Sequence, residues 1–340
     1  MLYNFIPAER VDDRPLSFWQ SHTWKRILEE SHQAQEVFYY GNLDGTYLLV
    51  EIRTLKLGML GAFVLGPKKI QIQSDFADFI TSLKKYLKKK WIVLFQVEPI
   101  EDSGMIESGL GVDKKKNPIM LLLTGSGNRV YKEFLTPYNR MIDLAPTEDE
   151  IFAQMREKGR YHINLAIKRD VTIEAVRATS ENIDTWMRLL SDTVSRDGFS
   201  GNSREYYEVF LSEIEKSYGT GLYFGSAEGR VIVAGIFVFT PERAIYYYGA
   251  SSSDKEDRKR MGSYLLQWHA IRDAKRRWIE YYDFLWVADP ANPHDHLKWV
   301  SDFKEKFWGY LVKQPPKLCV ILSWKGRVIL LLKTMFRRKW

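Results

Sequence analysis

The chain has 340 residues, of which 45% are apolar and 27% charged, and this length predicts two domains rather than general disorder. The single cysteine, Cys319, excludes an intramolecular disulfide and a cysteine-rich zinc site, and no apolar run approaches the ~18 residues of a membrane span. No signal-peptide pattern opens the sequence, so we expect a cytoplasmic protein, and its net charge of +7 favours polyanionic partners such as tRNA without identifying one.

An internal duplication organises the sequence. In the first half, strand-like segments at 36–40 and 47–52 flank a turn at 42–45, and a strand at 61–65, a basic helix from about 75 to 90 and a strand at 91–97 follow. The second half repeats this order with a hairpin at 222–226 and 231–239, a strand at 244–248, a helix from about 261 to 277 and a strand at 278–284. Helices at 20–31 and 183–195 precede the hairpins. This order predicts an α+β protein with two tandem units.

The boundary between the units is expected near residue 145. A strand-like segment at 140–144 closes the first unit, and Thr147 can cap a helix that begins at 148. We therefore expect domains at 1–145 and 146–317.

A basic tail at 318–340 follows these domains. It holds no acid, and its apolar residues at 328–332 alternate with the basic residues Lys325, Arg327, Lys333, Arg337, Arg338 and Lys339. This composition is typical of an amphipathic helix at a membrane surface. The alternative is a helix packed on the domain.

Several segments, in order along the chain, carry a family resemblance. They lie at residues 18–24, 95–99, 136–144, 155–168, 196–207, 247–252, 264–268, 282–284 and 303–309. Together they resemble the FemABX family, whose members duplicate a GNAT-like acyltransferase domain and move an amino acid from aminoacyl-tRNA to a muropeptide amine. The chain lacks the long charged helical hairpin that some members insert, so it is similar to the shorter FemX-type architecture.

The resemblance implies catalytic residues. Lys304, which follows Phe303 in the family's Phe-Lys dipeptide, would lie in the catalytic cleft and stabilise the oxyanion and the leaving ribose oxygen. Lys306 competes for this role, and a solvated lysine is the alternative. Glu98, where relatives carry an acid, could accept a proton from the attacking ammonium, although a strand-end carboxylate is as often structural.

Substrate contacts are implied in the same way. Tyr206 and either Tyr247 or Tyr248 resemble tyrosines of the muropeptide cleft, and strand alternation places Tyr247 on the face opposite Tyr246 and Tyr248. Simple aromatic packing is the alternative for each. Lys25 and Arg26 match a basic substrate contact. Relatives carry an arginine where this chain has Asn202, with Arg204 nearby, and an amide cannot offer a charged bidentate fork to pyrophosphate.

A basic helix offers a surface for tRNA or phosphate. Arg156 and Arg160 share a helical face, and Lys168 follows, although a solvated basic face explains the same pattern. We expect no metal site, because His294, Asp295 and His296 lie in a proline-rich loop.

These features predict an aminoacyltransferase that uses aminoacyl-tRNA as co-substrate, with no further cofactor. The acceptor would be the stem-peptide amine of lipid II or UDP-MurNAc-pentapeptide, and the tail could add peripheral membrane contact. Transfer to a lipid or a protein N-terminus, or a non-catalytic membrane-surface scaffold, are the alternatives. A coenzyme A-dependent acetyltransferase fits less well, because the loop at 259–262 is a poor pyrophosphate loop.

Overall fold

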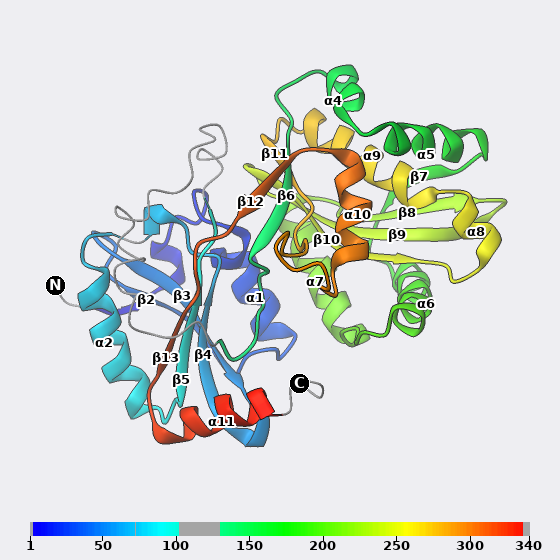
Figure 1. Ribbon diagram of the computed structural model, residues 1–340. Helices are drawn as coiled ribbons and strands as arrows, with labels where there is room; N and C mark the ends of the chain where they lie inside the picture. Colours follow the sequence, from blue (N-terminus) through cyan, green and yellow to red (C-terminus); the bar gives the residue numbers. More distant parts are fainter. Residues whose placement is uncertain (1–2, 72, 102–129, 336–340) are drawn as a thin grey trace. The chain divides into compact units, whose positions relative to one another are not determined.

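A computed structural model describes residues 3–71, 73–101 and 130–335 and shows two compact units (Figure 1). Unit 1 comprises residues 1–137 and 313–340, and unit 2 comprises residues 138–312. The basic residues Arg337, Arg338 and Lys339 of the expected tail lie outside the described residues.

Unit 1 is built on a six-stranded sheet in the order β1-β2-β3-β4-β5-β13. Its strands are β1 Asn4–Ile6, β2 Glu36–Gly41, β3 Tyr47–Thr54, β4 Leu60–Leu65, β5 Leu94–Glu98 and β13 Leu318–Ile321. Its α-helices are α1 His22–Glu30, α2 Phe76–Lys89 and α11 Trp324–Met335. Neighbouring strands are antiparallel except β4 and β5, which are parallel. The buried side chains of α2 recur at helical spacing and pack on the sheet, as its sequence pattern predicts.

Unit 2 repeats this plan with a seven-stranded sheet in the order β12-β6-β11-β10-β9-β8-β7. Its strands are β6 Tyr138–Asp143, β7 Thr172–Val176, β8 Leu222–Ala227, β9 Arg230–Phe239, β10 Arg243–Ser251, β11 Tyr281–Asp283 and β12 Tyr310–Lys313. Its α-helices are α4 Glu148–Gln154, α5 Glu157–Lys168, α6 Ser180–Asp197, α7 Arg204–Tyr218, α8 Lys255–Lys259, α9 Gly262–Arg276 and α10 Lys298–Lys304. The parallel pair here is β10 and β11, equivalent to β4 and β5. The expected hairpins and basic helices are therefore confirmed in both units.

The strands that follow each parallel pair are exchanged between the units. β6 comes after the first half of the chain but pairs with β11 in the second sheet. β13 comes after the second half but pairs with β5 in the first sheet. The structure thus differs from the expected boundary at 145, because the strand expected to close the first unit belongs to the second. It differs also from the expected separate tail, because residues 318–321 form a sheet strand.

Local sequence explains the helix ends. Thr147 caps α4 in a capping box with Glu150, as expected from the sequence. Both basic helices end in a Schellman motif whose left-handed residue is a tryptophan. Trp91 (φ 59°) follows α2 and Trp278 (φ 60°) follows α9. Glycine is the residue that this conformation favours, because a Cβ atom destabilises the left-handed region.

Candidate active site

A β-bulge in β10 sets the direction of three consecutive tyrosines. Tyr246 and Tyr248 pair with adjacent residues of β9, so Tyr247 is the extra residue between them. The rings of Tyr247 and Tyr248 lie 5.0 and 5.7 Å from the ring of Phe210 in α7. Tyr246 instead stacks on Phe237 within the core that includes α9. The expected alternation is therefore wrong at this point, because a bulge places two successive side chains on one face.

The hydroxyl group of Tyr248 joins three residues of the expected site. Asn202 Nδ2 donates to Tyr248 Oη over 3.2 Å, and the hydroxyl oxygens of Tyr206 and Tyr248 lie 3.0 Å apart. Ser203 fixes the start of α7 by accepting a hydrogen bond from the backbone N–H of Tyr206. Burial raises the pKa of Tyr248 well above its ordinary value, so this phenol stays neutral at physiological pH.

Lys304 lies at the end of α10 and is almost fully buried, with 3% of its surface exposed. Its Nζ donates to the backbone oxygens of Leu285 and Trp286 over 3.1 and 2.9 Å. Burial lowers the pKa of Lys304 to about 7, and the negative charge of Asp283 opposes this shift. A lysine ammonium has three hydrogens, so the two carbonyl groups leave one for another acceptor.

Aromatic contacts connect Lys304 to the tyrosine cluster. The Trp286 ring, whose backbone oxygen accepts from Lys304, lies 6.4 Å from the ring of Tyr247. Lys304 Nζ also lies 5.9 Å from the ring centroid of Tyr246, which packs in the core and is not part of this cluster. Phe303 points elsewhere, because its ring contacts Tyr264 and Phe307 in the core cluster. The expected residues Asn202, Tyr206, Tyr247, Tyr248 and Lys304 therefore form one connected group, and Phe303 supports it through packing.

Asp283 is a further residue of this region to which the sequence assigned no role. It is fully buried at the end of β11, and its carboxylate accepts from Arg243 Nη1 and Asn139 Nδ2, both over 3.1 Å, and from the Leu285 N–H over 2.7 Å. Burial raises the pKa of Asp283 and the Arg243 guanidinium opposes the shift. With three donors and a buried cation beside it, we assign the ionised form. An acid between Tyr282 and Phe284 in an apolar strand is the sequence feature that points to it.

Arg204 does not replace the missing arginine of the family pattern. Its Nε donates to Glu208 over 2.7 Å, and its other nitrogens contact Asp184 and Ser180. Hydrogen bonding to Asp184 raises the pKa of Arg204. These partners hold the guanidinium between α6 and α7.

The basic residues of α5 have structural partners. Arg156 precedes the helix, pairs with Glu305 and lies 5.8 Å from the Trp308 ring centroid. The guanidinium of Arg160 donates to backbone oxygens at the end of α4. Lys168 is exposed at the last turn. Two of the three residues expected to bind phosphate thus stabilise the α4–α5 connection.

The remaining expected residues belong to unit 1. On α1, Lys25 pairs with Glu29 over 2.5 Å and Arg26 is half-buried. Glu98 is fully buried, and its oxygens accept from the Leu135 N–H over 2.8 Å and from Lys317 Nζ over 3.2 Å. Burial raises the pKa of Glu98, and Lys317 opposes this rise. These contacts favour the structural alternative for Glu98, which fastens the backbone at 134–135 to β5.

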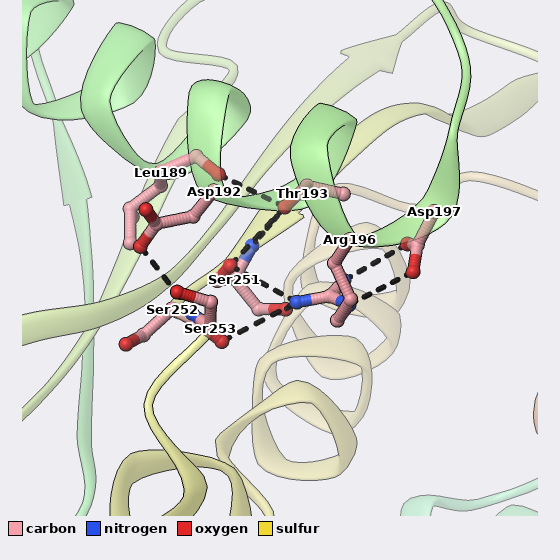
Figure 2. A network of polar contacts seen from close by, with 8 residues as sticks. All are labelled: Leu189, Asp192, Thr193, Arg196, Asp197, Ser251, Ser252 and Ser253. Atoms are coloured by element: carbon pink, nitrogen blue, oxygen red, sulfur yellow. Dashed lines mark hydrogen bonds and ion pairs between the residues drawn. The ribbon is translucent and has the colours of Figure 1, made fainter.

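Polar contacts hold α6 against the end of β10, the strand that carries the tyrosines (Figure 2). The Thr193 hydroxyl accepts from the Ser251 N–H over 2.9 Å, and Ser253 N donates to Asp192 over 3.3 Å. Arg196 donates to Ser251 Oγ over 3.2 Å and pairs with Asp197. The tyrosine-bearing strand is therefore fixed at the end that lies beyond the bulge.

A cavity of about 390 Å³ lies beside this network. Its lining residues are Thr185, Arg188, Arg230, Val231, Ser252, Asp254 and Asp257. None of the expected site residues lines it, and Arg230 pairs with the buried Asp257 over 3.0 Å. The charges of Arg230 and Asp257 in the cavity lining thus neutralise each other.

The part of the chain that the structure describes contains neither a metal-binding group nor a membrane-spanning helix. Residues 3–71, 73–101 and 130–335 hold no group of three His, Cys, Asp or Glu side chains placed to bind a metal ion. No helix within those ranges has the length and apolar character needed to cross a bilayer.

Known proteins resemble this chain in sequence and in fold. The FemAB family model matches residues 12–228 and 224–317. A lipid II:glycine glycyltransferase of Staphylococcus haemolyticus is 21% identical over 47% of this chain, a match that spans 39% of that relative. A crystal structure of FemX covers 99% of this chain and is itself covered completely, with a TM-score of 0.75 and 15% identity. A tandem GNAT protein of the clavulanic acid biosynthesis pathway matches 95% of this chain and 98% of its own, with a TM-score of 0.53 and 10% identity. The two units thus have the fold of tandem GNAT domains, and the chain belongs to the FemAB family.

Proposed function

We propose that this protein is an aminoacyltransferase that moves an amino acid from aminoacyl-tRNA to the stem-peptide amine of a peptidoglycan precursor. The observation that carries this proposal is Lys304, a buried lysine whose pKa falls to about 7 beside a cluster of neutral tyrosines. Perturbed titratable groups of this kind cluster at functional sites. Membership of the FemAB family and the glycyltransferase name of the staphylococcal relative support the same activity.

The proposed chemistry is acyl transfer without a covalent enzyme intermediate. The acceptor amine attacks the carbonyl carbon of the aminoacyl ester, an N–C bond forms, and the C–O bond to the ribose breaks. The proton lost by the amine balances the proton gained by the ribose oxygen. The Lys304 ammonium would stabilise the oxyanion and donate to that oxygen, because an N–H beyond its two carbonyl contacts can be directed at substrate.

The tyrosine cluster would position the acceptor. The neutral hydroxyls of Tyr206 and Tyr248 can donate and accept hydrogen bonds, and they suit the amide groups of a stem peptide. Asn202 adds an uncharged donor where the family pattern has arginine. Since Lys304 is 3% exposed, productive contact requires the substrate to displace part of the side-chain cover above it.

The donor and the location of the protein complete the proposal. We propose α5 as a surface for the tRNA phosphates, with Lys168 exposed for direct contact and Arg156 and Arg160, which are held by structural partners, adding positive potential near its start. Aminoacyl-tRNA is a co-substrate and no further cofactor is invoked. We place the protein in the cytoplasm, at the inner face of the plasma membrane.

Choice of donor provides the direct test. Purified protein is incubated with charged tRNA or acetyl-coenzyme A, together with UDP-MurNAc-pentapeptide or lipid II, and the product mass is measured. We expect a mass increase of one aminoacyl residue with charged tRNA only. Acetylation of an amine by acetyl-coenzyme A would contradict the proposal, and absence of any product from charged tRNA pools would favour a scaffold.

A further inference from the structure

One end of the first sheet carries two exposed tryptophans from distant parts of the chain. Trp91 is 85% exposed and Trp324 is 70% exposed. Their segments are neighbours, because the backbone N–H of Ser323 donates to the Val93 oxygen over 3.3 Å. Gly326 packs so closely on the same oxygen that a Cβ atom there would lie 2.2 Å from it. Figure 1 shows α11 passing across this end, where α2 ends and β5 begins.

Folding does not explain the tryptophan at position 91. Its backbone adopts the left-handed conformation that favours glycine, so the side chain destabilises the helix end. A side chain that is 85% exposed recovers little of this cost by packing. Packing within the fold therefore does not account for this side chain, and the groups around it are the guide to its role.

Helix α11 is apolar on two sides. Ile329 and Leu330 face inward and are 0% and 8% exposed. On the outer side, Trp324, Leu331 and Met335 recur at helical spacing and are 70%, 54% and 75% exposed. A surface helix normally places polar residues on its outer side, so this second apolar stripe suits contact with another phase or molecule.

A third apolar tip lies at the same end of the sheet. Leu57, in the turn between β3 and β4, is 73% exposed. The strand that follows this turn begins at Leu60, whose backbone oxygen accepts from the Val93 N–H over 2.9 Å. The turn therefore shares the sheet end with Trp91.

Positive charge surrounds these tips. Lys88 and Lys89 end α2, and Lys325 and Arg327 lie on α11, all of them exposed. No acid occurs in residues 84–97 or 318–335 of the sequence. Lys90 is excluded from this set because it pairs with Glu36 over 2.7 Å.

We propose that this end of unit 1 docks on the surface of an anionic lipid bilayer. The docking face consists of the apolar tips Leu57, Trp91, Trp324, Leu331 and Met335 and the basic residues Lys88, Lys89, Lys325 and Arg327. Tryptophan prefers the boundary between headgroups and acyl chains, aliphatic tips enter the acyl region, and lysines attract anionic headgroups. The inference deepens the proposed function by bringing the enzyme to a lipid-linked acceptor.

Lipid fits this face better than nucleic acid does. An RNA partner would use the lysines and stack on the tryptophans, but it offers nothing apolar to Leu57, Leu331 and Met335. A bilayer interface satisfies all three kinds of side chain together.

Unit 2 supplies a matched control. Trp278 occupies the equivalent Schellman position, with φ 60° and 92% exposure. Its surroundings differ, because the exposed Glu280 follows it and the Glu242 oxygen accepts from the Tyr281 N–H beside it. The basic residues that precede it, Arg276 and Arg277, both pair with Asp273, so the positive charge beside Trp278 is compensated and we assign it no membrane role.

The test is sedimentation of the full chain with vesicles of phosphatidylcholine, with and without phosphatidylglycerol. We expect binding to the anionic vesicles, a loss on the order of tenfold for Trp91→Gly, and no change for Trp278→Gly. Replacing Lys88 and Lys89 by glutamine should weaken binding about fivefold per charge, equivalent to about 1 kcal/mol each, and this effect should fade with salt.

Three controls make the outcome decisive. Glycine relieves the left-handed conformation, so both tryptophan variants should keep the unfolding temperature of the parent or exceed it. Transfer to the soluble UDP-linked precursor should be unchanged in Trp91→Gly, which separates docking from the proposed chemistry. The docking face would be overturned if Trp91→Gly bound the anionic vesicles as well as the parent does, or if Trp91→Gly and Trp278→Gly lost binding equally. It would also be overturned if replacement of Lys88 and Lys89 weakened tRNA binding and left vesicle binding unchanged.

Discussion

Replacement of Lys304 by methionine is expected to lower the rate of aminoacyl transfer by about 10² to 10³ while leaving unit 2 folded. A donor aimed at developing negative charge in a water-poor site contributes several kcal/mol to the transition state. The measurements are single-turnover transfer rates and the unfolding temperature of each variant. Lys306→Met is the matched control, because Lys306 lies two residues away, its side chain donates to the backbone oxygen of Asp302 over 2.8 Å, and the variant should retain activity. If Lys304→Met transfers at the parent's rate, Lys304 has no part in the mechanism.

The pKa of Lys304 gives this expectation a pH dependence. If the ammonium is the working form, transfer should decline as pH rises through about 7. Stability should show the opposite trend. Since the folded pKa lies below the unfolded value of about 10.4, the unfolded chain binds more protons between these limits, and the contribution of Lys304 becomes less unfavourable as pH rises. The stability of Lys304→Met relative to the parent should therefore be greatest near pH 7 and shrink toward pH 10. A rate that rises through pH 7 would instead indicate the neutral amine.

Replacement of Asp283 by leucine is expected to cost about 3–5 kcal/mol of folding free energy, the largest stability effect we predict. The substitution removes the nearer of the two carboxylates beside the guanidinium of Arg243, a residue that is 4% exposed: Asp283 lies 3.1 Å and Glu242 3.7 Å from its nitrogens. Denaturant unfolding measures the loss. The double variant Arg243→Met, Asp283→Leu should be less destabilised than the sum of the single variants, because the buried guanidinium and its nearest carboxylate are removed together.

Asp302→Ala is the control for Asp283. This carboxylate is half exposed and pairs with Lys298, so its removal should change stability by less than about 1 kcal/mol. A similar small loss for Asp283→Leu would show that the buried pair is dispensable. Where the variant folds, the declining limb of the rate profile should move to lower pH, because Asp283 opposes the lowering of the Lys304 pKa.

Local patterns in the sequence predict the parts of this fold that depend on neighbouring residues. The apolar spacing of α2 and α9, the Gly229 hairpin and the Thr147 cap each follow from residues a few positions apart. The exchange of β6 and β13 does not, since either strand has the same alternating pattern whichever sheet it joins. The helix α7, which lies between α6 and the second hairpin, was also not predicted as an element.

The candidate site also has residues that the sequence could identify and features that only the structure reveals. The resemblance identifies Lys304, Tyr206 and either Tyr247 or Tyr248, and the structure brings all four into one connected group. The bulge at Tyr247 depends on the register with β9, so alternation along one strand cannot reveal it. The resemblance could not separate a catalytic Glu98 from the structural one that the contacts favour, and charge could not show that Arg160 fastens the backbone.

The exchange of strands has a consequence for how the chain folds as it leaves the ribosome. After β5 is synthesised, its free edge stays open until the whole of unit 2 and then β13 have emerged. An open strand edge is a template for pairing with other chains, so this nascent state is exposed to aggregation. Cutting the gene between the two repeats would leave the first half without β13 and the second half without β6, each with the other half's strand attached. Each unit therefore needs a strand from the other half of the sequence, so the two units cannot be separated or exchanged as independent modules.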